Sequence, residues 1–194
     1  MEATATGTRA PTFLEEVMAA APGPYPRLDA CVQCGTCSGS CPSSADMDYT
    51  PRALFAMIAA GLKKEVLQSN TPWYCVSCYY CQVRCPQEIR IPEYMYALKR
   101  MSVREGYNKK SRTPEAADFS ETFVELVENY GRSFELGLAT LFHLRHHPLN
   151  AVKLASLGLT MLRKGRMDVM PNRIKNIDQL RAILARAKEV GGGQ

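Results

Sequence analysis

The sequence lacks any apolar run of about 18 residues, the length that a helix needs to cross a bilayer. Residues 1–21 have neither a basic start nor a long apolar segment, so they do not resemble a secretory leader. The glycine-rich G-x-G-x-x-G and P-loop sequences, which bind dinucleotides and phosphates, are also missing. These absences argue against a membrane-spanning, secreted or nucleotide-binding protein, and we expect a cytoplasmic location, where thiols stay reduced.

Cysteine is absent after Cys85, and all eight cysteines lie between positions 31 and 85. They form two runs with one spacing, C-x2-C-x2-C-x3-C-P. The first run is Cys31, Cys34, Cys37 and Cys41 followed by Pro42, and the second is Cys75, Cys78, Cys81 and Cys85 followed by Pro86. This spacing is typical of the ligands in bacterial [4Fe–4S] ferredoxin sites. Two such runs, which together use every cysteine, predict two [4Fe–4S] clusters.

Two other uses of the cysteines fit the sequence less well. Eight cysteines could form four disulfides in a small secreted domain, but a chain of 194 residues without a leader does not need them. Structural zinc takes two C-x2-C pairs for each four-sulfur site, which leaves the C-x3-C-P steps unexplained. We therefore interpret both runs as iron–sulfur ligands.

In two-cluster ferredoxins the fourth cysteine of each run binds the other cluster. This rule assigns Cys31, Cys34, Cys37 and Cys85 to cluster 1, and Cys75, Cys78, Cys81 and Cys41 to cluster 2. Crossed ligation places the clusters close together, which suits the transfer of single electrons. The residues between ligands are small in the first run and bulky in the second, so we expect cluster 2 to be more shielded and the two reduction potentials to differ, with a sign that the sequence leaves open.

Helical patterns fill the rest of the chain. Thr12 and Glu15 form a capping box before a short helix. Thr50-Pro51 starts a helix between the two runs, and Ile91-Pro92 starts another after them. The sequence therefore predicts an all-α fold, an α-helical ferredoxin domain that binds two [4Fe–4S] clusters, with additional N- and C-terminal helices. We expect a segment 1–24 with a short helix, a dicluster domain over 25–108 and a helical extension over 109–194.

The helical extension is basic and unusually apolar in one helix. From Arg132 onward there are eleven Lys or Arg against four Asp or Glu, about +7, within a formal net charge of +5 for the whole chain. The helix predicted over 148–164 is apolar on more than one face, through residues such as Leu157 and Leu159. A helix of that kind is either buried or docked on another chain, and we expect it to dock a partner.

Two further patterns in the extension concern acidic and histidine residues. Asp118 and Glu121 resemble a second capping box. His143, His146 and His147 could form a metal or haem site, but no acidic partner is spaced to support one. We expect these histidines to lie at the surface or to cap a helix.

The chain resembles the C subunit of heterodisulfide reductase and its bacterial relatives. The resemblance covers about residues 28–108 and rests on both cysteine runs, Gln-Cys-Gly-Thr-Cys at 33–37, Thr-Pro-Arg at 50–52, Gly-Leu-Lys-Lys-Glu-Val-Leu at 61–67, Trp-Tyr-Cys at 73–75 and Ile-Pro at 91–92. In that family, the C subunit carries two [4Fe–4S] clusters. It links an A subunit, which contains flavin and many iron–sulfur clusters, to a cysteine-rich catalytic B subunit, which reduces a disulfide.

The resemblance implies an electron-transfer protein of a hetero-oligomeric oxidoreductase complex, with partners like the A and B subunits and no nucleic acid. All eight cysteines would bind clusters, and the chain would have no catalytic residue or substrate site of its own. Similar domains also occur in the iron–sulfur subunits of quinone-linked glycerol-3-phosphate, glycolate and succinate oxidoreductases, which would place the chain at the inner face of the membrane through a partner. A structural or redox-sensing metal module is a third alternative.

Overall fold

The structure is a computed structural model that describes residues 10–21, 28–111, 113–146 and 148–190, with the backbone alone for 149–154. These residues form helices, turns and loops, and no strand occurs among them. The all-α prediction is therefore confirmed. The chain divides into two compact units, Met1–Pro114 and Glu115–Gln194, which are described separately.

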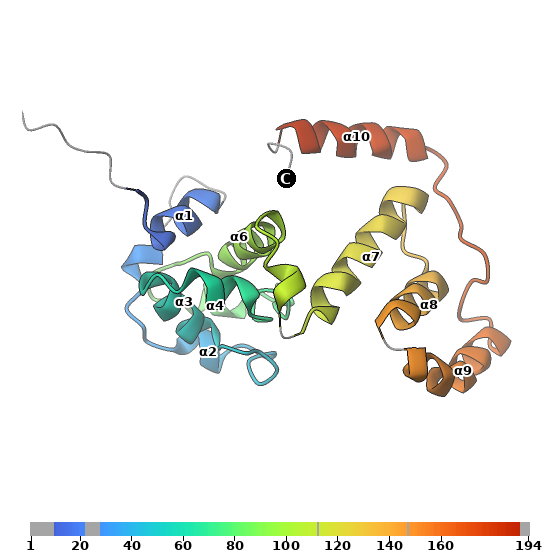
Figure 1. The fold of residues 1–194 in the computed structure, drawn as a ribbon, viewed down its shortest axis with the longest axis horizontal. Coiled ribbons are helices and arrows are strands. Elements are labelled where there is room, and N and C mark those ends of the chain that lie inside the picture. The colour runs from blue at the N-terminus through green and yellow to red at the C-terminus, as the bar shows by residue number, and fades with distance from the viewer. Residues whose placement is uncertain (1–9, 22–27, 112, 147, 191–194) are drawn as a thin grey trace, which may run out of the picture. The chain divides into compact units, whose positions relative to one another are not determined.

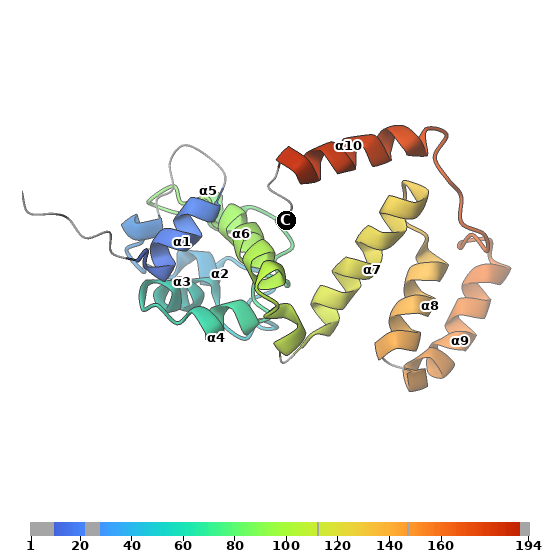
Figure 2. The ribbon, with the colours of Figure 1, turned by 45° about the horizontal axis from the view of Figure 1, so that its top comes forward.

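Unit 1 contains all eight cysteines. Its α-helices are α1 (Phe13–Ala20), α2 (Thr36–Gly39), α3 (Pro51–Ala59), α4 (Lys63–Gln68), α5 (Tyr80–Val83) and α6 (Ile91–Arg104), and its 3₁₀ turns are η1 (Leu28–Ala30) and η2 (Asn108–Lys110). Figures 1 and 2 show α1, α3 and α4 gathered around α6. The two short helices, α2 and α5, lie against each other and carry one cysteine each.

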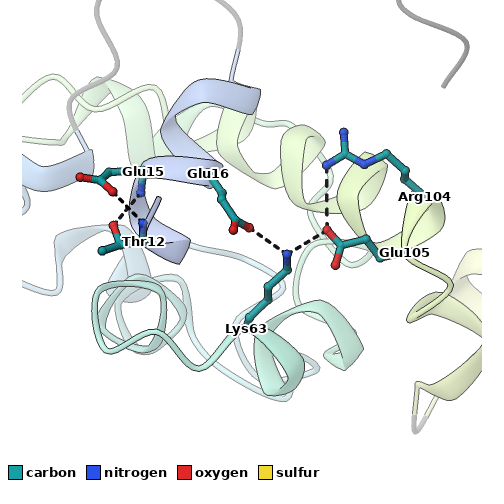
Figure 3. A network of polar contacts seen from close by, with 6 residues as sticks. All are labelled: Thr12, Glu15, Glu16, Lys63, Arg104 and Glu105. Atoms are coloured by element: carbon teal, nitrogen blue, oxygen red, sulfur yellow. Dashed lines mark hydrogen bonds and ion pairs between the residues drawn. The ribbon is translucent and has the colours of Figure 1, made fainter. Parts of the chain in front are cut away.

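Local signals set the ends of these helices as expected. Thr12 caps α1 through a full capping box, in which its hydroxyl accepts from the Glu15 N–H and the Glu15 carboxylate accepts from the Thr12 N–H (Figure 3). Thr50 caps α3, where Pro51 occupies the first helical position. Gly61 follows α3 with a φ of 78°, a left-handed conformation that glycine adopts without steric cost.

Helix α6 forms the centre of the core of unit 1. Its side chains Tyr94, Met95, Leu98 and Met101 are all at most 2% exposed, at the three- and four-residue spacing of one helical face. The ring of Tyr94 packs edge-on against that of Phe55 from α3, with 6.2 Å between centroids. Burial of each such side chain contributes about 1.5–3 kcal/mol. The core therefore fixes α6 and α3, the helices on which the cysteine runs rest.

A small ionic network joins α1, α4 and the end of α6 (Figure 3). The Lys63 ammonium lies 2.8 Å from the Glu16 carboxylate and 3.0 Å from that of Glu105. Arg104 lies 3.9 Å from the same Glu105 carboxylate. The hydrogen bond to Glu16, with Glu105 in support, raises the pKa of Lys63 above its ordinary value. The network ties three helices together at the edge of the core.

Unit 2 contains α7 (Glu115–Tyr130), α8 (Glu135–His146), α9 (Pro148–Arg163) and α10 (Ile177–Val190). Helix α8 packs against both α7 and α9, and α10 packs against α7 (Figure 2). A Lys188–Glu128 ion pair of 2.8 Å joins α10 to α7. Among the described helices of either unit, none combines the length and the apolar character needed to cross a lipid bilayer.

One prediction for unit 2 is wrong, and one acidic contact was not predicted. Asp118 does not cap α7, because the helix already begins at Glu115. Its carboxylate instead lies 3.3 Å from the ring of His146, so that histidine has an acidic partner that sequence spacing did not reveal. The His143 ring contacts the Ala139 carbonyl of its own helix at 2.8 Å, and His147 lies outside the described residues.

Candidate iron–sulfur sites

Both cysteine runs fold in the same way around their first three cysteines. Gln33 and Ser77, which precede the second cysteine of each run, have φ values of 56° and 53°. Gly35 and Tyr79, which follow that cysteine, have φ values of 80° and 62°. Left-handed residues that alternate with ordinary ones turn successive backbone N–H groups toward one side, as in the concave nests that surround iron–sulfur sites. The backbone of each run is therefore concave around its first three cysteines.

The third and fourth cysteines of each run are placed by a single turn of helix. Cys37 lies in α2 and Cys81 lies in α5. Each helix then stops, and Cys41 and Cys85 follow in the non-helical chain before Pro42 and Pro86. Proline cannot continue a helix from within, so the chain leaves in a new direction at this point. Arg84 joins the two ends by donating from Nη1 to Ser40 Oγ at 3.2 Å.

The structure brings the eight cysteines together in two groups of four. The first group lines a cavity with an empty volume of about 360 Å³, which includes open solvent. The described residues that line it are Cys31, Val32, Gln33, Cys34, Gly35, Thr36, Cys37, Arg52, Phe55, Cys85, Pro86, Gln87, Ile89 and Ile91. Three of the four thiols come from the first run, and the fourth, Cys85, comes from the second.

The second group lines a cavity of about 370 Å³, measured in the same way. Its described lining residues are Cys41, Met47, Pro51, Cys75, Val76, Ser77, Cys78, Tyr79, Cys81, Ile91, Pro92 and Met95. Here Cys41 is the one thiol from the first run. Among the described residues, no three His, Cys, Asp or Glu side chains converge closely enough to hold a single metal ion. The thiols instead stand apart on the walls of two cavities, and four sulfurs per cavity are the donor set of a [4Fe–4S] cluster.

A polar clamp joins the chain after the first run to the chain before the second, and consists of Asp46, Asp48, Tyr49, Asn70 and Thr71. The Asp48 N–H donates to Asn70 Oδ1 at 2.6 Å, and the Asn70 N–H donates back to Asp48 Oδ2 at 2.8 Å. Asn70 Nδ2 also donates to the Asp46 carbonyl at 3.0 Å. Thr71 Oγ1 accepts from the Tyr49 N–H at 3.0 Å and donates to the Tyr49 carbonyl at 2.8 Å.

The clamp affects the second cavity because its residues lie in the sequence between Cys41 and Cys75, two of the cysteines that line this cavity. Asn70 and Thr71 are 5% and 0% exposed, so their hydrogen bonds are shielded from water and costly to lose. The two clamped segments are 22 residues apart in sequence, and no local pattern indicated that they pair. The clamp therefore positions the crossed cysteine, Cys41, next to the second run.

Burial and hydrogen bonding affect the thiols unequally. Burial, with a contribution from the neighbouring thiol of Cys75, raises the pKa of Cys81 to about 11. Burial also raises the pKa of Cys37 and of Cys41. The exposed Cys34 differs, because hydrogen bonding from Thr36 lowers its pKa. Thiols with raised pKa values lose their protons only when a bound cation compensates the charge, so a metal that binds them releases protons.

The bulky residues of the second run divide between its cavity and solvent. Val76 and Tyr79 line the cavity, whereas Tyr80 and Val83 do not and are 59% and 82% exposed. Greater shielding of cluster 2 than of cluster 1 stays a prediction. Neither the clamp nor the place of Arg52 in the first cavity was predicted, although Arg52 belongs to the Thr-Pro-Arg piece of the resemblance.

Comparison with known proteins agrees with this arrangement. Residues 27–89 match the family model of the 4Fe-4S dicluster domain. The chain is 33% identical over 113 residues to the iron–sulfur C subunit of CoB–CoM heterodisulfide reductase from Methanopyrus kandleri, across 54% of this chain and 59% of that protein. It is 40% identical over 79 residues to the C 2 iron–sulfur subunit of the CoB–CoM heterodisulfide reductase from Methanocaldococcus jannaschii, across 41% of this chain and 42% of that protein.

A third relative gives a similar match. The chain is 38% identical over 80 residues to the C subunit of the H2:CoB–CoM heterodisulfide, ferredoxin reductase from Methanothermobacter marburgensis, across 41% of this chain and 43% of that protein. The matched part thus spans between two fifths and three fifths of these relatives. The matches confirm the resemblance drawn from the sequence. This chain carries a 4Fe-4S dicluster domain, and over that part it is similar to the iron–sulfur C subunits of heterodisulfide reductases.

Proposed function

We propose that this chain is an electron-transfer subunit that carries two [4Fe–4S] clusters. The observation that supports this most directly is the grouping of the cysteines, four around each of two cavities. Each group combines three cysteines of one run with the fourth cysteine of the other, which is the crossed pattern of two-cluster ferredoxins. When bound, such clusters accept and release one electron at a time.

In this proposal Cys31, Cys34, Cys37 and Cys85 bind cluster 1, and Cys75, Cys78, Cys81 and Cys41 bind cluster 2. The left-handed residues of both runs turn backbone N–H groups toward one side of each run, and N–H donors that reach cluster sulfurs tune the potential. The polar clamp and the contact between Arg84 and Ser40 hold the two runs in register. Ile91 lines both cavities, so the two sites share a wall and the clusters lie near each other.

The partners follow from the relatives, which are named as the C subunits of reductases. We propose a hetero-oligomer in which residues 25–108 relay electrons between a flavoprotein of the A type and a cysteine-rich catalytic protein of the B type. The helical extension 109–194 would dock a partner, and the exposure of Leu157 and Leu159 on α9, 57% and 59%, supports this role. The basic residues that follow α9, such as Lys164 and Arg166, would also suit a quinone-linked dehydrogenase at an anionic membrane surface.

Iron content and redox behaviour test the clusters. The chain purified without oxygen should hold about eight iron atoms, four for each cluster, and should be reduced and reoxidised reversibly. Cys34→Ser and Cys78→Ser should each remove or alter one cluster and block electron transfer. Normal iron content together with unimpaired electron transfer in either variant would contradict the ligand assignment, and a metal that does not cycle would favour a structural module.

A pulldown from the native host, also without oxygen, tests the partners. Recovery of a flavoprotein together with a cysteine-rich protein would support the complex of the heterodisulfide reductase type. Recovery of a quinone-linked dehydrogenase or a cytochrome, with the chain in the membrane fraction, would instead favour the second function. The cluster ligands would be the same in both cases.

A further inference from the structure

The walls of the two cavities differ in charge. Among its described lining residues, the first cavity includes one charged side chain, that of Arg52. The described lining residues of the second cavity include none and contribute two methionines, Met47 and Met95. The thiols are arranged alike in both sites, so this charge is the main difference between them.

Arg52 is held against the first run from two directions. Its backbone N–H donates to Ser38 Oγ at 2.9 Å, which ties the start of α3 to α2. Its side chain passes over Gly35, where an added Cβ would lie 3.4 Å from Arg52 Cδ and 3.7 Å from Nη1. The Arg52 side chain therefore lies next to Gly35, between Cys34 and Cys37 of the first run.

The charge of Arg52 is not neutralised by a neighbour. No carboxylate in the described part of the chain lies within ion-pair distance of its guanidinium. Other cations of unit 1, such as Lys63 and Arg90, do pair with glutamates. Arg52 is exposed to solvent and lines the first cavity, so its positive charge lies at the edge of that site.

Lys99 is the cation associated with the second run, and its position is different. Its ammonium lies 5.8 Å from the ring centroid of Trp73 and 5.4 Å from that of Tyr96, and Lys99 does not line the cavity. No residue described in the wall of the second cavity therefore supplies a cation to match Arg52.

We propose that Arg52 raises the reduction potential of cluster 1 above that of cluster 2, so that an electron entering the pair rests on cluster 1. One-electron reduction adds one negative charge to a cluster and forms or breaks no bond. A positive charge in the cavity wall favours the reduced form by Coulomb attraction, and local charge is one of the factors that tune such potentials. The inference rests on the proposed function, because it requires two bound clusters.

The test is a redox titration of the full chain, loaded with clusters without oxygen and followed by electron paramagnetic resonance of the reduced clusters. Wild type should show two one-electron couples. Arg52→Gln should lower the reduction potential of the higher couple by about 59 mV, which is a tenfold change in the equilibrium constant for one electron. The reduction potential of the lower couple should not change. Arg52→Lys should restore most of the loss because it keeps the charge.

A control variant tests whether the effect is specific to this wall. Lys99→Gln removes a cation that does not line the first cavity, so the higher couple should hold its value. An equal fall in Lys99→Gln, or an unchanged higher couple in Arg52→Gln with full iron content, overturns the proposal. A fall of the lower couple in Arg52→Gln overturns it as well.

A second substitution keeps the proposal testable if Arg52→Gln fails to retain iron. Gln87 lines the same cavity, and Gln87→Glu adds a negative charge there at nearly constant size while Arg52 stays in place. It should lower the same couple, and an unchanged couple would refute control of cluster 1 by charge at this wall. If wild type shows no pair of reversible couples, the proposed function itself fails, an outcome distinct from all of these.

Discussion

Replacement of Thr71 by valine should destabilise unit 1 by about 2–6 kcal/mol. Valine has nearly the shape of threonine but neither donates nor accepts, so the Tyr49 N–H and the Tyr49 carbonyl would both lose their partner. Thr71 is fully buried, and each buried polar group left unpaired costs about 1–3 kcal/mol. The change removes no core volume, so the loss reports the two hydrogen bonds of the clamp.

Urea unfolding followed by the fluorescence of Trp73, the single tryptophan, measures this loss close to the substitution. With a slope of about 2 kcal/mol per molar urea, the midpoint should fall by about 1–3 M. Thr71→Ser keeps the hydroxyl and loses one methyl group, so it should cost about 1 kcal/mol. A loss below about 1 kcal/mol in Thr71→Val, or an equal loss in both variants, would refute the reasoning that the clamp stabilises the site.

Four further substitutions test other parts of unit 1. Leu98→Ala, at a fully buried position of α6, should cost about 2–5 kcal/mol in the same unfolding assay, and a loss under about 1 kcal/mol would show that α6 is not the centre of the core. Gly35→Ala should lower the free energy of unfolding by about 1–2 kcal/mol, because φ at this position is 80°. Tyr79→Gly, at the equivalent position of the second run, should change the stability little or increase it. A larger loss in Tyr79→Gly than in Gly35→Ala would contradict the conclusion that the two runs have the same backbone conformation. Lys63→Met should cost about 0.3–1 kcal/mol at pH 7, since its ion pairs are partly exposed. Because the pKa of Lys63 is raised, this stabilisation is complete below its ordinary value of 10.5 and disappears as the pH rises through the folded value, so the variant and wild type should converge there.

Short-range features of the fold could be predicted because they depend on residues a few positions apart. The capping box at Thr12, the proline start of α3 and the glycine after it each act within one or two helical turns. The spacing of the cysteines is likewise local, and it identified the type of site together with the eight side chains that line the two cavities. These features can therefore be recognised in the sequence without any tertiary information.

Interactions between distant segments were not predicted, and some were predicted wrongly. Asp118 was expected to cap its own helix but contacts His146 from the next helix along the chain. Among the bulky residues of the second run, Val76 and Tyr79 line the cavity while Tyr80 and Val83 are exposed, a division that the sequence did not indicate. In both cases a residue type suits several environments, and the packing of other segments decides which one it meets.

The sequence by itself determined the all-α class, the starts of α1, α3 and α6 and the spacing of the two cysteine runs. The tertiary structure alone decided the pairing of Asp48 and Tyr49 with Asn70 and Thr71, and the approach of Arg52 to the first cavity. The physical reason is that helix ends and ligand spacing follow from neighbouring residues, whereas the clamp and the charge at a cavity wall depend on which segments the buried core brings together. The core around α6 therefore makes two chemically similar cysteine runs into two electrostatically different sites.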